Sequence, residues 1–401
     1  MINKFKQNKK NNGRSLTINT KHGKITTPFF MSDATRGFIK TLSGTDLNNI
    51  GLGAMVVNAY HLYLQPGLEI IKIIGGIHKF MGWPGPLLAD SGGFQIFSLI
   101  HSHPKMGKIT DEGAEFKSIW GGSLQKMTPE KSMQIQFDLG VDMMVCLDDC
   151  PPNNFSKKEL KIAVGRTIAW AKRCRVEYGK QIKARGITNN LPLLFGVIQG
   201  GPYLDLRKYC LNKLVKIGFD GYGFGGSPID AKGNLQEAVL KSIARLIPEN
   251  SLRFALGIGT PADICQCASF GWDMFDCVIP TREGRHGRLF QKISNPPAGR
   301  AGFQPACRTG RFPTRLPDGQ VSKSFYSTIN INNSNFKNDF TPINPNSNLP
   351  ELKSYSRAYL HHLFKLNEAL GRRLAVLNNL EFYMNLMEDI RHIYKTKILK
   401  N

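Results

Sequence analysis

Acidic and polar residues that could carry out group transfer stand at the ends of short apolar runs in this sequence. Two runs end in aspartates, at Asp90 and Asp148, and a third contains Asp276, while two others close with the amide of Gln199 and with the glycine pair 225–226. Two carboxylates can cleave a glycosidic bond, one as nucleophile and one as general acid or base, while an amide and glycine backbone read a purine edge. Each aspartate alone can equally be a helix cap or a turn former.

The apolar runs that precede these residues are of strand length and recur along the chain. Each ends in a polar or glycine-rich turn, and most are followed by a helical pattern. We therefore predict eight strands, at residues 29–31, 54–60, 86–90, 142–148, 193–200, 221–226, 253–259 and 274–280. Two of the intervening helices carry clear boundaries, because Thr128 and Thr260 each precede a proline and Gly140 and Gly271 follow as stop signals.

Eight alternating strands and helices predict an α/β fold, a closed parallel (β/α)8 TIM barrel. An open doubly wound sheet fits less well, because no dinucleotide-binding G-x-G-x-x-G follows the first strand. In such a barrel the reactive groups project from the carboxyl ends of the strands. The fold would therefore bring the carboxylates, the amide and the glycines to one mouth.

The composition favours a polyanionic partner. The chain has 401 residues and a formal net charge of +23, which points to nucleic acid first and to an anionic membrane second. We expect no transmembrane segment, since the longest apolar runs are only of strand length. Residues 1–20 predict a basic N-terminal tail, either solvated or contacting RNA. This tail lacks the apolar stretch of a secretory signal, so we expect a cytoplasmic protein.

A long insertion interrupts the regular pattern before the last helices. Residues 291–328 are rich in Pro, Gly and Arg and have no apolar period, so we expect them to be disordered. The whole insertion covers residues 291–354, whereas 21–290 and 355–401 make up the barrel with its C-terminal helices. The chain thus predicts one large barrel with an inserted subdomain.

Helical periodicity returns at Tyr355 and predicts two helices that are broken near Gly371. The eight cysteines include no C-x-x-C pair, so neither a disulfide framework nor a standard zinc knuckle is expected. Cys265 and Cys267 lie two apart in a predicted helix and point in different directions, which indicates a packing role.

Several specific and different motifs are distributed over nearly the whole chain, apart from the insertion. They are Asn58-Ala59-Tyr60-His61-Leu62 with Gln65-Pro66-Gly67, Asp90-Ser91-Gly92-Gly93-Phe94-Gln95, Phe195-Gly196-Val197-Ile198-Gln199-Gly200, and the segments 218–222, 257–261, 273–282 and 355–363. Together they resemble the bacterial tRNA-guanine transglycosylase family. The resemblance implies a pentosyltransferase that exchanges the anticodon wobble guanine of tRNA for a 7-deazaguanine base through a covalent enzyme-RNA intermediate, in queuosine biosynthesis.

The resemblance also implies a role for each residue of the predicted site. Asp276 would be the nucleophile that attacks the ribose, and Asp90 the general acid/base. Asp148 and Gln199 would read the purine edge. The other residues implied in base binding are Ser91, Gly225, Gly226 and Ser227, together with Phe94 and Leu256, which would sandwich the flipped base.

Basic residues directly after the nucleophile strand would hold anticodon phosphates, although they could equally form a solvated loop. They are Arg282, Arg285, His286 and Arg288. The side chains of Ile229 and Cys150 beside the site resemble those of the bacterial form of the family. They predict 7-aminomethyl-7-deazaguanine as the incoming base.

Members of the family hold a structural zinc through three cysteines and a histidine. The aligned positions here are Ser347, Leu349, Leu352 and Asn378. None of them supplies a thiolate or an imidazole, so we expect no metal and no other cofactor in this remnant of the zinc subdomain. In the family this region helps to build a dimer. The resemblance therefore implies a homodimer, but the missing zinc ligands weaken that prediction.

Two rival functions compete with the transglycosylase. Loss of the zinc ligands suits a non-catalytic tRNA-binding paralogue, but retention of both Asp90 and Asp276 argues against it. The other rival is a barrel hydrolase of nucleosides or sugars that uses the same carboxylates. Such a hydrolase would have no need of the high positive charge.

Overall fold

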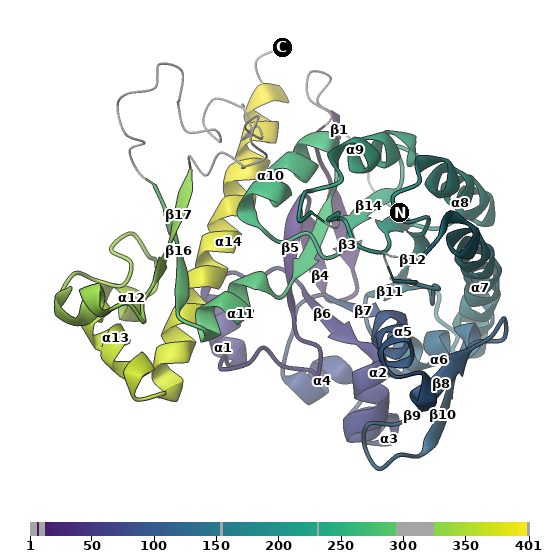
Figure 1. Ribbon diagram of the computed structural model, residues 1–401, viewed down its shortest axis with the longest axis horizontal. Helices are drawn as coiled ribbons and strands as arrows, with labels where there is room; N and C mark the ends of the chain where they lie inside the picture. Colours follow the sequence, from purple (N-terminus) through teal and green to yellow (C-terminus); the bar gives the residue numbers. More distant parts are fainter. Residues whose placement is uncertain (1–5, 8–12, 153–154, 231, 294–324, 399–401) are drawn as a thin grey trace.

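Eight parallel strands close into a barrel at the centre of the protein (Figure 1). The computed structural model describes residues 6–7, 13–152, 155–230, 232–293 and 325–398. Around the barrel the strands follow the order β11-β12-β13-β14-β15-β5-β6-β7, and every neighbouring pair is parallel. The predicted (β/α)8 barrel is therefore confirmed.

Each predicted run overlaps one barrel strand, although β5 continues past its run, β14 begins one residue before its run, and most of the others end before the polar residues that close the run. The observed strands are β5 (Phe29–Asp33), β6 (Met55–Asn58), β7 (Leu87–Asp90), β11 (Met143–Val145), β12 (Leu193–Ile198), β13 (Gly221–Phe224), β14 (Leu252–Ala255) and β15 (Met274–Cys277). Their side chains are almost all buried. This explains why the strands read as continuous apolar runs rather than as alternating ones.

Helices surround the barrel and connect its strands. They are α1 (Gly44–Asn49), α2 (Ala59–Leu62), α3 (Leu68–Ile73), α4 (Ile77–Met81), α5 (Gly93–Ser102), α6 (Pro129–Leu139), α7 (Lys157–Ala184), α8 (Leu204–Ile217), α9 (Glu237–Leu246), α10 (Pro261–Phe270) and α11 (Ile279–Arg285). The predicted boundaries of α6 and α10 are confirmed. The hydroxyls of Thr128 and Thr260 cap their first turns, and Gly140 and Gly271 end them with positive φ angles.

A small antiparallel sheet that the sequence did not predict stands between α5 and α6. Its strands are β8 (Gly107–Ile109), β9 (Ala114–Lys117) and β10 (Leu124–Met127). Three strands of three or four residues, separated by turns, carry too short a pattern to be recognised by period alone. Trp120 lies exposed in the turn between β9 and β10, and the guanidinium of Arg36 lies 5.5 Å from the centre of its ring.

The end of the barrel opposite the mouth is closed by residues that the sequence placed in a tail. The hairpin of β3 (Thr17–Thr20) and β4 (Gly23–Thr26) follows β2 (Arg14–Ser15), which pairs with β1 (Lys6–Gln7). Arg14 is buried, and its Nε and Nη2 donate to the two carboxylate oxygens of Asp273 at 2.8 and 2.6 Å. The predicted boundary of the tail at residue 20 is therefore wrong, because a basic residue here is paired rather than solvated.

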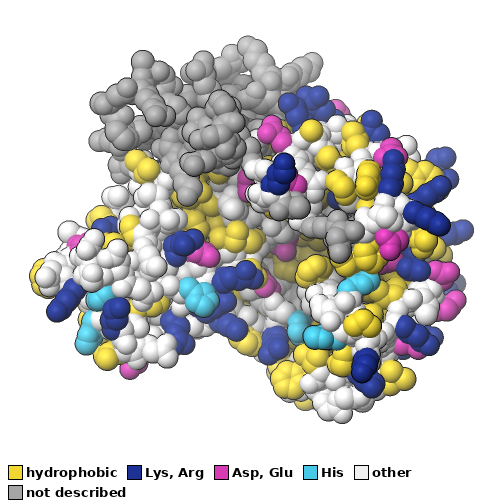
Figure 2. All heavy atoms as spheres, viewed as in Figure 1, with side chains coloured by type: hydrophobic (Ala, Val, Ile, Leu, Met, Phe, Trp, Pro, Cys, Tyr) yellow, Lys and Arg dark blue, Asp and Glu magenta, His cyan; other side chains and the backbone are white. Residues whose placement is uncertain are grey.

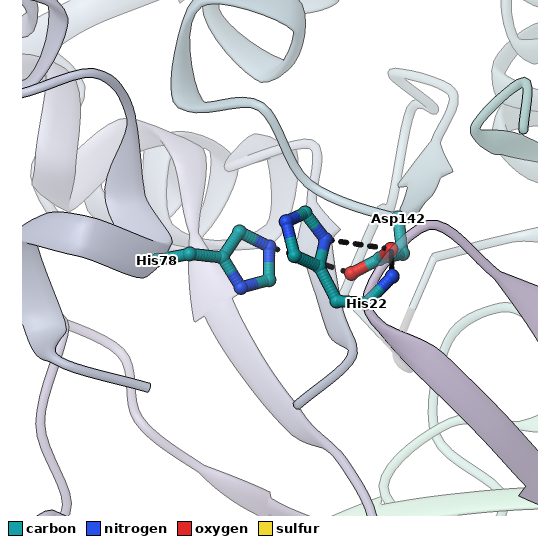
Figure 3. Close-up of side chains that lie close together, drawn as sticks. All are labelled: His22, His78 and Asp142. Atoms are coloured by element: carbon teal, nitrogen blue, oxygen red, sulfur yellow. Dashed lines mark hydrogen bonds and ion pairs between the residues drawn. The ribbon is translucent and has the colours of Figure 1, made fainter. Parts of the chain in front are cut away.

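Two histidines share a buried aspartate at the same end (Figure 3). His22 Nδ1 lies 2.9 Å from Asp142 Oδ1, and His78 Nε2 lies 3.4 Å from Asp142 Oδ2. The two rings stack with centroids 3.5 Å apart and planes inclined by 19°. The hydrogen bond of His22 and the approach of His78 to the same carboxylate tie the hairpin to α4 and to the residue that precedes β11.

The C-terminal part of the chain forms a subdomain beside the barrel (Figure 1). It contains β16 (Arg288–Lys292) paired with β17 (Tyr326–Asn330), the 3-10 turn Ser334–Asn338, α12 (Pro350–Ser354), α13 (Arg357–Lys365) and α14 (Ala369–Ile398). Both ends of the predicted disordered segment are thus strands, which is a correction. The remainder of that segment, residues 294–324, lies outside the described residues.

The two predicted C-terminal helices are confirmed, but their break lies earlier than expected. The chain turns at residues 366–368, where Asn367 has a φ of 60°, and Gly371 lies inside α14. A Cβ atom at Gly371 would lie 2.9 Å from Leu363 Cβ, so this glycine allows α13 and α14 to pack closely instead of ending a helix. None of the helices in the described part of the chain is long and apolar enough to cross a membrane.

Replacing Arg14 by leucine should lower the free energy of unfolding by about 3–5 kcal/mol, because it leaves the Asp273 carboxylate buried without its cation. Chemical denaturation of wild type and variant measures this. Arg185→Leu is the control, since it removes a more exposed ion pair with Asp138 and should cost less than about 1 kcal/mol. Equal losses in the two variants would mean that residues near Arg14 are not part of the folded core.

Candidate active site

The carboxyl ends of the barrel strands bring the predicted site residues to one mouth. Asn58 and Asp90 lie opposite each other at the ends of β6 and β7, and Asp276 pairs with Met31 where β15 lies beside β5. Asp148 and Gln199 follow the neighbouring strands β11 and β12. Segments that are far apart in sequence thus meet because the barrel closes, as the sequence predicted.

Asp90 is held at the mouth by two hydrogen bonds. Asn58 Nδ2 donates to one of its oxygens at 2.7 Å, and the backbone N–H of Gly92 donates to the other at 2.9 Å. Burial raises the pKa of Asp90 to about 7 although both hydrogen bonds lower it, and the negative charges of Asp33 and Asp276 add to the rise. Asp90 therefore can take up and release a proton near neutral pH.

Asp276 accepts one hydrogen bond from a neighbouring loop. The backbone N–H of Gly257 donates to its Oδ1 at 2.9 Å. Burial raises the pKa of this carboxyl to about 6, against that hydrogen bond and with the help of the negative charge of Asp33. The pKa of Asp90 thus lies above that of Asp276, so the two carboxyls favour different protonation states near neutral pH.

A further carboxylate at the mouth escaped the sequence analysis as a site residue. Asp33 ends β5, and its Oδ1 accepts hydrogen bonds from the N–H and the hydroxyl of Thr35. Its charge acts on both Asp90 and Asp276 and raises the pKa of each. The signal was present in the sequence, since Asp33 follows an apolar run as the other aspartates do.

Asp148 and Gln199 contact each other directly. Gln199 Nε2 donates to Asp148 Oδ2 at 2.6 Å, and both side chains are buried. Burial raises the pKa of Asp148 to about 6, the hydrogen bond from Gln199 lowers it, and the charge of Asp149 raises it. Asp149 itself is paired with Arg166 at 2.5 Å, so it is a structural residue. Gln199 and Asp148, which are buried and bonded to each other, form a polar edge at the mouth.

The loop after β13 supplies backbone groups next to this edge. Gly226 has a φ of 74°, and its backbone N–H faces the thiol of Cys150, a residue predicted to lie beside the site. The carbonyl of Ser227 accepts a hydrogen bond from Gln236 Nε2 at 2.9 Å, and the hydroxyl of Ser227 donates to the carbonyl of Ile229 at 2.7 Å. The carbonyl and the hydroxyl of Ser227 therefore already take part in hydrogen bonds with nearby residues.

The remaining residues predicted to bind the base differ in exposure. Phe94, in the first turn of α5, has 63% of its surface exposed, whereas Leu256 is half-buried after β14. Ser91 is buried, its hydroxyl accepts from the N–H of Gly93 at 3.3 Å, and its carbonyl accepts from the hydroxyl of Ser132 at 3.1 Å. Phe94 can cover a planar ligand, but Ser91 mainly shapes the start of α5.

Basic residues stand beside the carboxylates on a helix rather than on a loop. Arg282 and Arg285 belong to α11, which follows the strand of Asp276, and His286 and Arg288 lie directly after it. Burial and the charge of Arg282 lower the pKa of Arg285, while Asp33 opposes them. Figure 2 shows Lys, Arg and His side chains around a hollow in this face of the molecule. Such a rim can bind phosphates.

Comparison with known proteins identifies the family. The family model described as queuine tRNA-ribosyltransferase matches residues 9–400. The chain belongs to this family. It is 38% identical to the queuine tRNA-ribosyltransferase of Clostridium tetani over 95% of this chain and 92% of the relative. It is also 38% identical to that of Staphylococcus aureus strain JH9, over 96% of this chain and 89% of the relative. The family predicted from the motifs is thus confirmed, and with it the prediction of an enzyme.

The four positions aligned with the family zinc ligands do not fit a metal. Ser347 Oγ donates to Glu381 Oε2 at 2.6 Å, and Leu349 and Leu352 are buried in the apolar core. The amide of Asn378 donates to the carbonyl of Phe290 at 3.0 Å. A hydroxyl, two alkyl groups and an amide cannot replace thiolates and imidazole around zinc.

Proposed function

We propose that this protein exchanges a guanine of tRNA, at the wobble position of the anticodon, for a 7-deazaguanine base. The observation that carries the proposal is the pair of Asp276 and Asp90 at one mouth, with pKa values of about 6 and about 7. Different protonation of two neighbouring carboxyls is what double displacement at a glycosidic carbon requires. The rim of Arg282, Arg285, His286 and Arg288 supports a polyanionic substrate.

In the first half of the reaction the ionised carboxylate of Asp276 attacks C1′ of the ribose. The bond between C1′ and the guanine nitrogen breaks, and an ester joins Asp276 to the RNA. Asp90 transfers its proton to the leaving guanine and becomes a carboxylate. The hydrogen bond from the Gly257 N–H holds Asp276 in place for this attack.

In the second half the incoming base displaces the enzyme. Asp90 takes a proton from the ring nitrogen of this base and is restored to its acid form. The nitrogen then attacks C1′, the ester bond breaks, and Asp276 leaves as a carboxylate. No atom is lost from the ribose, and the enzyme returns to its starting protonation state.

Base selection belongs to the polar edge beside these carboxylates. Asp148 and Gln199 bind the Watson-Crick edge of the purine, helped by the backbone of Gly225, Gly226 and Ser227, while Phe94 and Leu256 lie on its two faces. Cys150 and Ile229 next to this edge support 7-aminomethyl-7-deazaguanine as the incoming base. The homodimer and the cytoplasmic location stay predictions.

The inserted subdomain, in this proposal, folds without zinc. Glu381 on α14 accepts hydrogen bonds from the hydroxyl of Ser347 and from the N–H of Asn348, both at 2.6 Å. Asn344 Nδ2 donates to Asn378 Oδ1 at 3.3 Å. These bonds join the loop of residues 344–348 to α14, as a zinc ion bound by both would do. They support a metal-free fold.

Asp276→Asn should abolish the covalent enzyme-RNA adduct and base exchange, because an amide is a far poorer nucleophile than a carboxylate of the same shape. Incubation with labelled tRNA, followed by denaturing electrophoresis, detects the adduct. Asp205→Asn, on the exposed surface of α8, is the control and should keep both. An adduct in the Asp276 variant would refute the assigned nucleophile. Wild-type protein that binds tRNA without exchanging its guanine would instead support the non-catalytic paralogue.

The pH dependence of kcat/KM should be bell-shaped. Activity rises as Asp276 ionises near pH 6 and falls as Asp90 loses its proton near pH 7. Asp33→Asn removes a negative charge that raises both pKa values, so both limbs should shift to lower pH. Guanine incorporation into tRNA, measured from pH about 5 to about 9, tests this. Limbs that stay in place in the variant would contradict the role given to Asp33.

Purified protein should contain well below one zinc ion per chain, and a strong chelator should change neither its melting temperature nor its exchange activity. Glu381→Gln should lower the melting temperature, because it weakens the bonds to Ser347 and Asn348. Glu388→Gln, at an exposed position of the same helix, is the matched control and should not. Stoichiometric zinc that leaves together with activity on chelation would reveal a substitute site and overturn the metal-free fold.

A further inference from the structure

A fully buried arginine lies behind the polar edge that faces the base. Arg207 is 0% exposed, and within the described chain its hydrogen bonds go to backbone carbonyls rather than to a carboxylate. Nε donates to Gly201 at 2.7 Å, Nη1 to Ile198 at 2.8 Å and Nη2 to Gly225 at 3.0 Å. Burial lowers its pKa to about 9, so it still carries a charge at neutral pH. A buried charge without an acidic partner is costly, which argues for a function of this placement.

The three carbonyls flank the groups that read the base. Ile198 directly precedes Gln199, and Gly225 directly precedes Gly226. The peptide bonds at these positions are trans, so a carbonyl and the N–H of the same unit point in opposite directions. A carbonyl of Gly225 that points to Arg207 therefore turns the N–H of Gly226 away from it, toward the thiol of Cys150 and the base pocket.

Close packing leaves these groups little freedom. The guanidinium of Arg207 lies 3.7 Å from the centre of the Phe224 ring. A Cβ atom at Gly200 would lie 2.7 Å from the backbone nitrogen of Arg207, and one at Gly225 would lie 2.6 Å from Gln199 Nε2. The same carbonyl of Ile198 also accepts from the N–H of Gly225 at 3.0 Å. The guanidinium fork thus holds the ends of β12 and β13 in one arrangement.

We propose that Arg207 is the positioning residue of the base pocket, which sets affinity and selectivity for a purine by fixing the peptide units before Gln199 and Gly226. The inference rests on the proposed function, because it concerns the same site. Arg207 does not touch the base. It acts through the direction of the Gly226 N–H and through the place of the Gln199 amide, which also bonds Asp148.

The test uses the full chain and free guanine as the probe. Calorimetry gives the dissociation constant for guanine, and steady-state exchange gives separate KM values for guanine and for tRNA. The variants are Arg207→Met, which loses all three hydrogen bonds, and Arg207→Lys, which keeps the charge and part of the bonding. Arg253→Met is the matched control. Arg253 is also buried and also bonds backbone carbonyls, those of Gly271 and Ile247, but at the opposite end of the barrel.

Arg207→Met should raise the dissociation constant and KM for guanine by about tenfold or more, as the loss of one well-placed hydrogen bond does. The KM for tRNA should stay within about twofold, because phosphate contacts hold the polyanion. Preference for guanine over adenine should fall, and Arg207→Lys should lie between wild type and Arg207→Met. Arg253→Met should lower the melting temperature and leave guanine affinity unchanged.

Two results would overturn the role of Arg207. One is an unchanged guanine affinity in both Arg207 variants. The other is an equal loss of guanine affinity in Arg253→Met, which would mark a general loss of stability. If Arg207→Met does not fold, the guanine affinities of Arg207→Lys and Arg253→Met are compared instead. A loss in Arg207→Lys alone supports the role of Arg207, and an equal loss in both overturns it. Wild-type protein that does not bind guanine would instead refute the proposed function, and the inference with it.

Discussion

Crowding of carboxylates at the mouth of a closed barrel is the constraint on which the site depends. Barrel closure directs the ends of β5, β7 and β15 to one place, so the charges of Asp33, Asp90 and Asp276 act on one another. Partial removal from water favours the neutral forms of Asp90 and Asp276, and the negative charge of Asp33 adds to the rise of both pKa values. Uncharged donors oppose this rise: Asn58 and the Gly92 N–H at Asp90, and the Gly257 N–H at Asp276. Under-compensated acids are what proton transfer near neutral pH requires.

The opposite end of the barrel treats its charges differently. Asp273 there receives two bonds from Arg14, and Asp142 accepts from His22 and from the N–H of Leu87. The partners of Asp142 hold its pKa below the usual range although burial raises it, whereas burial raises the pKa values of Asp90 and Asp276 at the mouth. Stability and chemistry are therefore separated along the barrel axis, as is usual for this fold. The two buried arginines follow the same division, since Arg253 bonds carbonyls at the closed end and Arg207 bonds carbonyls behind the base pocket.

The sequence predicted the barrel and most of the site because both follow from local patterns. Continuous apolar strands have a recognisable length. Polar residues at their carboxyl ends all lie at the same end of a parallel barrel. Asp33 was missed as a site residue although it obeys the same rule. Arg207 could not be found in this way, because an arginine on a helix normally faces solvent and nothing in the pattern shows that α8 turns it inward. Arg14 was assigned to a tail for the same reason, since its partner Asp273 is 259 residues away in sequence.

The subdomain is joined to the mouth of the barrel through α14. Asn379 Nδ2 on α14 donates to the carbonyls of Pro280 and Arg288, one at the start of α11 and one after its end, at 3.0 and 2.9 Å. Tyr383 donates its hydroxyl to the carbonyl of Gly259 at 2.6 Å, near the loop that holds Asp276. Glu381 lies between these two residues and bonds the loop of Ser347. Leu349 and Leu352, directly after this loop, are buried in the apolar core and add to its attachment. All of these contacts meet on one helix, so α14 joins the loop of Ser347 to the residues around α11 and to the backbone near Asp276.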